Sequence, residues 1–355
     1  MSGAGHGFDA FLLLSFGGPE APEDVLPFLR NVTRGRAVPE PRLAEVAGHY
    51  AHFGGVSPIN GHNRALIAAL AADFARHGIE LPIYWGNRNW EPYLVDAVRQ
   101  MRDDGVRRAL VIATSATGSY SACRQYREDL AEARAQAGAG APELVKLRHF
   151  FDHPGFVAAN VERVRAALGT LAASERGTAR LVFTAHSVPV RMNDTSGPPG
   201  FGGGLYEAQQ RETARLVAAL VREQADPDFD LVWQSRSGPA QAAWLEPDVN
   251  DHLRALAAGG TRAVVVCPTG FVADHVEVAW DLDVEARETA AELGLHFARA
   301  GTAGTHPGFV AAVREIVQEQ TDGLAPKALG SLGLCGVDCP AGCCPPAPRR
   351  AGAAG

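Results

Sequence analysis

The sequence lacks several features that would assign the chain to a special class of protein. It has no apolar run near the ~20 residues needed to cross a bilayer, and residues 1–7 lack the charged-then-apolar order of a signal peptide. It also lacks an excess of basic residues: the net charge is −7, whereas proteins that bind nucleic acids usually carry a basic stripe. We therefore expect a cytoplasmic protein with no integral membrane segment and no nucleic-acid partner.

Cysteine is scarce, with six residues in 355, and its distribution is uneven. Because disulfides are rare in a reducing cytosol, we do not expect paired cystines. Cys267 ends an apolar run and is expected to be a small core residue. Thiols clustered near the end of such a chain predict a metal site. The clustered residues are Cys335, Cys339, Cys343 and Cys344, with Cys123 far upstream.

A full GxGxxG pattern is also absent. The apolar run 8–16 ends in Gly17-Gly18-Pro19 and precedes a predicted helix, but this turn does not imply a dinucleotide. Predicted strands and helices alternate along the chain, which argues for βαβ units and parallel sheets. The further strands are expected over 81–85, 108–114, 179–185, 230–234, 263–267 and 295–299, and the helices over 23–31, 64–77, 93–102, 122–136, 207–224 and 306–319.

The length of 355 residues allows two domains, and two short echoes suggest that they are related. Residues 151–159 are echoed by 305–312, and residues 105–111 by 260–265, with nearly the same separation. Duplication of one α/β unit would leave such echoes. Residues 193–204 are rich in glycine and proline and are predicted to form a mobile loop.

The stretch 269–285 carries most of the chemistry. It follows a run typical of a buried parallel strand, and Asp274 is a candidate helix N-cap. In the following helix Glu277, Asp281 and Glu285 are four residues apart and share one face. Their repulsion, a few tenths of a kcal/mol per pair, would be offset by a cation or by protons moving along the row. A solvated acidic face is the alternative, but the position at a strand's carboxyl end favours a site.

His186 ends another predicted strand in the same way. One strand end therefore offers an imidazole and another a carboxylate. This combination suits a divalent metal such as Fe²⁺ or Zn²⁺, or a pair of groups that transfers protons. A purely structural histidine is the alternative at this point.

Several motifs together resemble the ferrochelatase family, in its order and spacing, from about residue 8 to 317. They are LLSFGGP at 13–19, GGVSP at 54–58, FTAHSVP at 183–189, WQS at 233–235, WLEPDV at 244–249 and GFVADHVE at 270–277. The details are most similar to the actinobacterial branch, which implies coproporphyrin III as substrate rather than protoporphyrin IX.

The resemblance implies an enzyme that inserts Fe²⁺, its metal substrate, into a porphyrin with loss of two pyrrole protons. It implies an α/β fold of two Rossmann-like, chelatase-type domains with parallel sheets and a porphyrin cleft between them. The expected domains are residues 8–125 plus 305–330, and residues 126–304. A Cys-rich tail would follow at 331–355.

The family's metal-binding and catalytic histidine and glutamate fall on His186 and Glu277. Asp281 and Glu285 continue a row that the family associates with metal or proton passage, in a helix widened to π geometry. Such widening is frequent at functional sites.

The resemblance also implies porphyrin contacts. Ser57 and Tyr126 match positions that contact propionates, and Arg34 lies in the matching basic loop, where a guanidinium would suit a carboxylate. An ordinary loop role is the alternative for Arg34. Where some coproporphyrin-using members carry a tyrosine able to ligate the product iron, this chain has Phe16, which cannot ligate.

Several members of the family hold a [2Fe–2S] cluster on one internal and three C-terminal cysteines. Here Cys123 would be the internal ligand, and Cys335, Cys339 and Cys344 are chosen by spacing, which leaves one tail thiol spare. A zinc site or a tail of free thiols is the alternative.

The function implied is formation of Fe-coproporphyrin in haem biosynthesis, with coproporphyrin III as partner and transient contact with other haem-pathway enzymes. A protoporphyrin IX ferrochelatase or another tetrapyrrole chelatase is the neighbouring alternative. A non-catalytic haem or porphyrin carrier is the alternative from another class. A carrier needs no acidic row, so Glu277, Asp281 and Glu285 argue against it.

Overall fold

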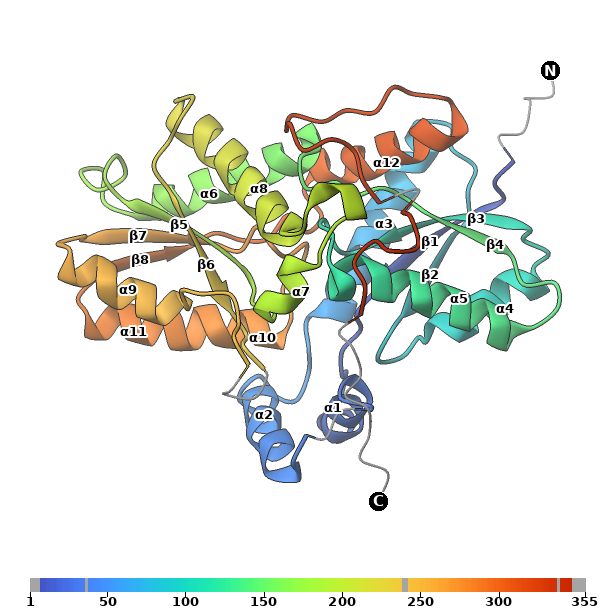
Figure 1. The fold of residues 1–355 in the computed structure, drawn as a ribbon, viewed down its shortest axis with the longest axis horizontal. Helices are drawn as coiled ribbons and strands as arrows, with labels where there is room; N and C mark the ends of the chain where they lie inside the picture. Colours follow the sequence, from blue (N-terminus) through green and yellow to red (C-terminus); the bar gives the residue numbers. More distant parts are fainter. Residues whose placement is uncertain (1–6, 36–37, 238–241, 337–338, 347–355) are drawn as a thin grey trace.

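The computed structural model describes residues 7–35, 38–237, 242–336 and 339–346. Within them the chain forms two four-stranded parallel sheets, each covered by helices on both faces (Figure 1). The predicted α/β class with parallel sheets is confirmed. None of the described helices is long and apolar enough to span a membrane.

The two sheets have the same strand order. The first is β2 (Ile83–Asn87), β1 (Ala10–Ser15), β3 (Arg108–Ala113) and β4 (Glu143–Lys146). The second is β6 (Asp230–Gln234), β5 (Arg180–His186), β7 (Ala263–Cys267) and β8 (His296–Arg299). In each half the chain places its second strand at one edge, followed by its first, third and fourth. This repetition is what a duplicated unit would produce.

The helices connect the strands in chain order. They are α1 (Val25–Val32), α2 (Glu40–His52), α3 (Ile59–Arg76), α4 (Leu94–Asp103), α5 (Gln125–Ala137), α6 (Pro154–Thr170), α7 (Val190–Asp194), α8 (Leu205–Arg222), α9 (Val249–Ala258), α10 (Val276–Ala279), α11 (Ala286–Glu292) and α12 (Pro307–Thr321). Two 3₁₀ turns, η1 (Pro22–Asp24) and η3 (Pro199–Phe201), and two π turns, η2 (Tyr120–Arg124) and η4 (Trp280–Glu285), complete them.

The central strands β1 and β7 are buried along their whole length. Helices cover both faces of a parallel sheet, so a central strand needs apolar side chains on both faces. One face of the first sheet packs with α3 and α12, and the other with α4 and α5. The second sheet lies between α6 and α8 on one face and α9 and α11 on the other.

The echoed sequence at 151–159 and 305–312 forms the starts of α6 and α12, which pack against each other. His153 and His306 are the N-caps, and each accepts a hydrogen bond from the backbone of Gly155 or Gly308, two residues later, at 3.2 and 3.1 Å. The echo is therefore a helix start that packs against its own copy.

Three expectations differ from the structure. β4 pairs with β3, so the first sheet includes residues 143–146, which were predicted to belong to the second domain. Residues 193–204 are not a plain loop, because they include the end of α7 and the turn η3. Asp274 is not the N-cap of α10, which is His275. The domain limits otherwise stay a prediction, and residues 347–355 of the expected tail lie outside the described residues.

Candidate functional site

His186 is the last residue of β5, and two hydrogen bonds fix its position. Its Nδ1 lies 2.5 Å from the carbonyl oxygen of Ser187, and the Tyr206 hydroxyl donates to the carbonyl of His186 at 2.8 Å. A nitrogen so close to a carbonyl oxygen must carry a proton, so in the neutral imidazole the lone pair is on Nε2. About one third of the side chain is exposed (35%), so this lone pair is available to a ligand.

Glu277 lies in the first turn of α10, just beyond β7, the neighbour of β5. Its Oε2 is 3.9 Å from Nε2 of His186. The intervening turn approaches β5 closely: Gly270 donates to the Thr184 carbonyl at 3.1 Å, and a Cβ on Gly270 would lie 2.5 Å from that of Ala185. Only glycine allows this approach, which brings together the two strand ends predicted to form the site.

Asp281 lies in the π turn η4 and is partly buried. Its Oδ2 accepts hydrogen bonds from Gln234 Nε2, at 3.1 Å, and from the Ser235 hydroxyl. Burial, with the charges of Glu277 and Glu285, raises the pKa of Asp281 to about 7, although the two hydrogen bonds oppose this shift. A carboxyl with this pKa can take up and release protons near neutral pH.

The acidic row follows the widened helix that the resemblance implied. η4 spans Trp280–Glu285, so the predicted π geometry is confirmed, and Trp280 Nε1 donates to Glu285 Oε1 at 2.8 Å. From the other half of the chain, His49 of α2 stacks on the Trp280 ring, with centroids 4.1 Å apart and planes 7° from parallel. His49 and Trp280 could not be predicted as part of the site, because nothing in their local pattern shows that α2 reaches η4.

Two of the expected porphyrin contacts lie at accessible positions. Phe16 follows β1 and packs with the apolar cluster of α1 and α2, which also contains Val276, the neighbour of Glu277. Phe16 therefore lies on the side of the first half that meets α10. Arg34 is exposed after α1, and its guanidinium donates to the Asn31 side chain.

The other two expected contacts are buried. Ser57 is 3% exposed and its backbone amide donates to the Pro19 carbonyl at 2.8 Å. Tyr126 is 5% exposed, lies in the core of the first half, and carries the Arg88 guanidinium 3.8 Å above its ring centroid. The structure therefore does not place the Tyr126 ring on an open surface.

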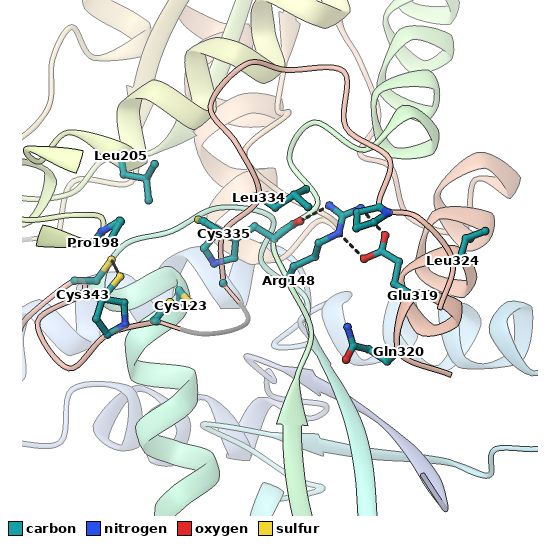
Figure 2. A pocket seen from close by; sticks show the side chains of 16 residues that line it. Cys123, Arg148, Pro198, Leu205, Glu319, Gln320, Leu324, Leu334, Cys335 and Cys343 are labelled. Atoms are coloured by element: carbon teal, nitrogen blue, oxygen red, sulfur yellow. Dashed lines mark hydrogen bonds and ion pairs between the residues drawn. The ribbon is translucent and has the colours of Figure 1, made fainter. Parts of the chain in front are cut away.

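The cysteines form a second site away from His186. A cavity of about 420 Å³ is lined by five of them, together with His149, Arg148 and Glu319 (Figure 2). Cys123 comes from the π turn η2, and the others, Cys335, Cys339, Cys343 and Cys344, come from the tail. The structure thus gathers all four thiols proposed as cluster ligands, and Cys343 with them. In the described part of the chain, no three His, Cys, Asp or Glu side chains are arranged as a metal site.

The thiols of this cavity differ in their surroundings. A hydrogen bond with Cys123 lowers the pKa of Cys339, whereas burial raises that of Cys335. Burial raises the pKa of Cys343 to about 11, and its Sγ lies 3.7 Å from that of Cys344. The Gly197 amide donates to the sulfur of Cys344 at 3.1 Å. Cys267 lies apart in the core of the second half, which confirms its prediction as a packing residue.

Comparison with known proteins agrees with this geometry. The family model described as Ferrochelatase matches residues 8–321. The chain is 57% identical to a coproporphyrin III ferrochelatase of Nocardia farcinica over 98% of this chain and 99% of that protein. It is 59% identical to one of Mycolicibacterium smegmatis over 90% and 92% of the two chains.

A solved structure shares the fold. SirB from Bacillus subtilis with Fe³⁺ aligns with a TM-score of 0.53 at 12% identity, over 88% of this chain and 96% of the other. At that identity the likeness concerns the fold alone. The sequence relatives and the family model are decisive: the chain belongs to the ferrochelatase family.

Proposed function

We propose that this protein inserts Fe²⁺ into coproporphyrin III and so forms Fe-coproporphyrin (coproheme) in haem biosynthesis. Two close relatives are named coproporphyrin III ferrochelatases, and this chain aligns with nearly the whole length of each. The structural observation that carries the proposal is the pair His186 and Glu277, whose Nε2 and Oε2 lie 3.9 Å apart at neighbouring strand ends. A catalyst of this reaction needs such a pair, whereas a carrier does not.

The chemistry assigns a role to each group of the pair. Metal insertion replaces two pyrrole protons with one Fe²⁺, so two protons must leave the ring. We propose that the His186 Nε2 lone pair faces the macrocycle and accepts protons, with Glu277 as the neighbouring carboxylate that binds the metal or passes protons on. Their moderate exposure suits a metal that is a substrate, because it must leave for the ring.

Asp281 extends this route. Its pKa of about 7 lets it exchange protons at neutral pH, and Glu285 continues the row toward the Trp280 side chain. We propose that protons leave, or Fe²⁺ arrives, along Glu277, Asp281 and Glu285. The hydrogen bonds from Gln234 and Ser235 hold Asp281 in place on this route.

We propose that the macrocycle lies beside the contact between α2 and η4, where His186 and Glu277 face it. Phe16 would pack against it without ligating the iron, and Arg34 would bind a propionate through its exposed guanidinium. Ser57 would act from the wall of the same region. The buried Tyr126 would act indirectly, because its ring supports Arg88, which is also paired with Asp129 at 2.5 Å.

We further infer that the cysteine cavity holds a [2Fe–2S] cluster on Cys123, Cys335, Cys339 and Cys344. Five thiols at one cavity supply more than the four thiolates that such a cluster takes. When bound, the cluster would supply a one-electron redox centre. The four cysteines would at the same time join the tail to η2. The residues present fit the group in kind and number, with Cys343 as the spare thiol.

A metal-insertion assay tests the proposed function. Purified protein is given Fe²⁺ with either coproporphyrin III or protoporphyrin IX under anaerobic conditions, and porphyrin absorbance is followed. We expect rapid insertion into coproporphyrin III and slow insertion into protoporphyrin IX. A preference for protoporphyrin IX would contradict the substrate, and tight porphyrin binding without insertion of any divalent metal would indicate a carrier.

A further inference from the structure

His149 contacts Cys335 through both its backbone and its side chain. The residue lies between β4 and α6 and is 3% exposed. Its backbone amide donates to the Cys335 carbonyl at 2.9 Å, and its Nδ1 lies 3.1 Å from the Cys335 sulfur. These contacts join two segments that are 186 residues apart in the sequence.

Two glycines lie close against the imidazole. A Cβ on Gly118 would lie 2.7 Å from its Cε1, and a Cβ on Gly336 would lie 2.8 Å from its Cδ2. Gly336 also has a φ of 106°, which side chains rarely adopt, so glycine is required there on two counts. The imidazole also interacts with the Cys123 thiol, and the side chain lines the cysteine cavity.

A second donor acts on the same sulfur. Gln209, which is fully buried, places Nε2 3.3 Å from Cys335 Sγ and accepts a hydrogen bond from the Gly118 amide at 2.7 Å. With Nδ1 of His149 protonated, two N–H groups point at one sulfur. These two donors, one from each side chain, restrain the position of the Cys335 sulfur in the cavity. No comparable pair of N–H donors on Cys343 is seen in the described part of the chain.

We propose that His149 is a positioning residue of a metal site in this cavity, and that the sulfur it holds, Cys335, is one of the ligands. The inference rests on the proposed function only in that a metal group occupies the cavity. His149 would orient Cys335 as carboxylates and carbonyls orient metal-bound histidines in other proteins. Loss of such outer partners typically costs 10–100-fold in metal affinity.

The test uses Co²⁺ as a probe on the full chain after removal of its own metal. Thiolate-to-cobalt charge transfer reports only sulfur ligands, so the His186 and Glu277 pair does not contribute to the signal. We expect His149→Leu to weaken Co²⁺ binding by about 10–100-fold. His149→Asn, which keeps an N–H donor, should recover most of the affinity, and Cys267→Ser should match the wild type.

Equal Co²⁺ affinity in His149→Leu and the wild type would overturn the proposal, as would equal loss in the leucine and asparagine variants. If His149→Leu does not fold, Gln209→Leu tests the same sulfur. A smaller loss in the same direction is then expected, and unchanged affinity would overturn the proposal. The visible absorbance of the untreated protein tests the [2Fe–2S] assignment separately. An error in that assignment can therefore be distinguished from the absence of a role for His149.

Discussion

Gly155 of α6 and Gly308 of α12 touch where the two helices cross: a Cβ on Gly155 would lie 2.2 Å from the Gly308 carbonyl oxygen. The contact joins the two copies of the echoed sequence. Histidine–glutamate contacts repeat across it, with His153 Nε2 3.4 Å from Glu315 Oε2 on the opposite helix, and His306 in the matching position 2.8 Å from Glu162. The duplication inferred from sequence is therefore also present as a matched set of contacts.

Gly155→Ala should destabilise the protein, because the added methyl group cannot fit without separating α6 from α12. Overpacking of this kind typically costs 1–3 kcal/mol. Gly169→Ala is the matched control: it lies in the same helix with nothing within 4 Å of an added Cβ, and should stabilise by up to ~1 kcal/mol. Urea unfolding measures the stability of both variants. Equal effects of the two substitutions would contradict the close contact of α6 and α12 at Gly155.

The raised pKa of Asp281 predicts that the free energy of unfolding depends on pH. Its pKa rises from 3.8 unfolded to about 7 folded, so between these values the folded state binds more protons than the unfolded state. Stability should therefore fall as pH rises from 4 to 7 and level off above 7. Asp281→Asn removes this loss and should be more stable than the wild type at pH 8, on the order of 2 kcal/mol after solvent screening. The difference should vanish near pH 4, and an equal difference at both pH values would refute the assignment.

Arg34→Ala should raise KM for coproporphyrin III more than it lowers kcat, because a propionate contact is made equally in ground and transition states. A charge-assisted hydrogen bond contributes roughly 1.5–3 kcal/mol, which corresponds to about tenfold or more in affinity. Arg30→Ala is the control, because Arg30 lies on α1 but is already paired with Glu40 at 3.2 Å. If Arg34→Ala leaves coproporphyrin affinity unchanged, the basic loop does not bind the substrate.

Cys123→Ser should abolish the reddish-brown colour and dithionite-sensitive absorbance expected of a [2Fe–2S] cluster. Cys267→Ser should keep both, because that thiol lies in the core of the second half. Visible spectra and metal analysis of the two variants and the wild type measure this. Colourless wild-type protein with about one zinc per chain, grown with ample iron, would replace the cluster with a zinc site.

Much of the fold and of the central pair was predictable, because both depend on local patterns. Buried strands such as β1 and β7 are continuous apolar runs, and parallel strands bring their carboxyl ends together, which places His186 near Glu277. β4 was missed because it has only four residues, of which the first is exposed.

The remainder depends on contacts between distant segments. Asp274 has the residue type and position of an N-cap, but Arg299 of β8 takes its carboxylate in a two-point ion pair at 2.6 and 3.0 Å. The burial of Tyr126 beneath Arg88 follows from the packing of α5 on the first sheet. His149 becomes part of the cysteine site only when the tail folds back over it. Each of these interactions is tertiary, so no local pattern shows it.

The most direct test of the central claim is Fe²⁺ insertion into coproporphyrin III by His186→Ala and Glu277→Gln, measured together with porphyrin binding. The alanine removes the nitrogen that accepts protons, and the glutamine keeps the shape of Glu277 but removes its charge. Both variants should bind coproporphyrin III as the wild type does and lose nearly all insertion activity. Near-normal turnover in either variant would contradict the assignment of this pair as the reacting groups.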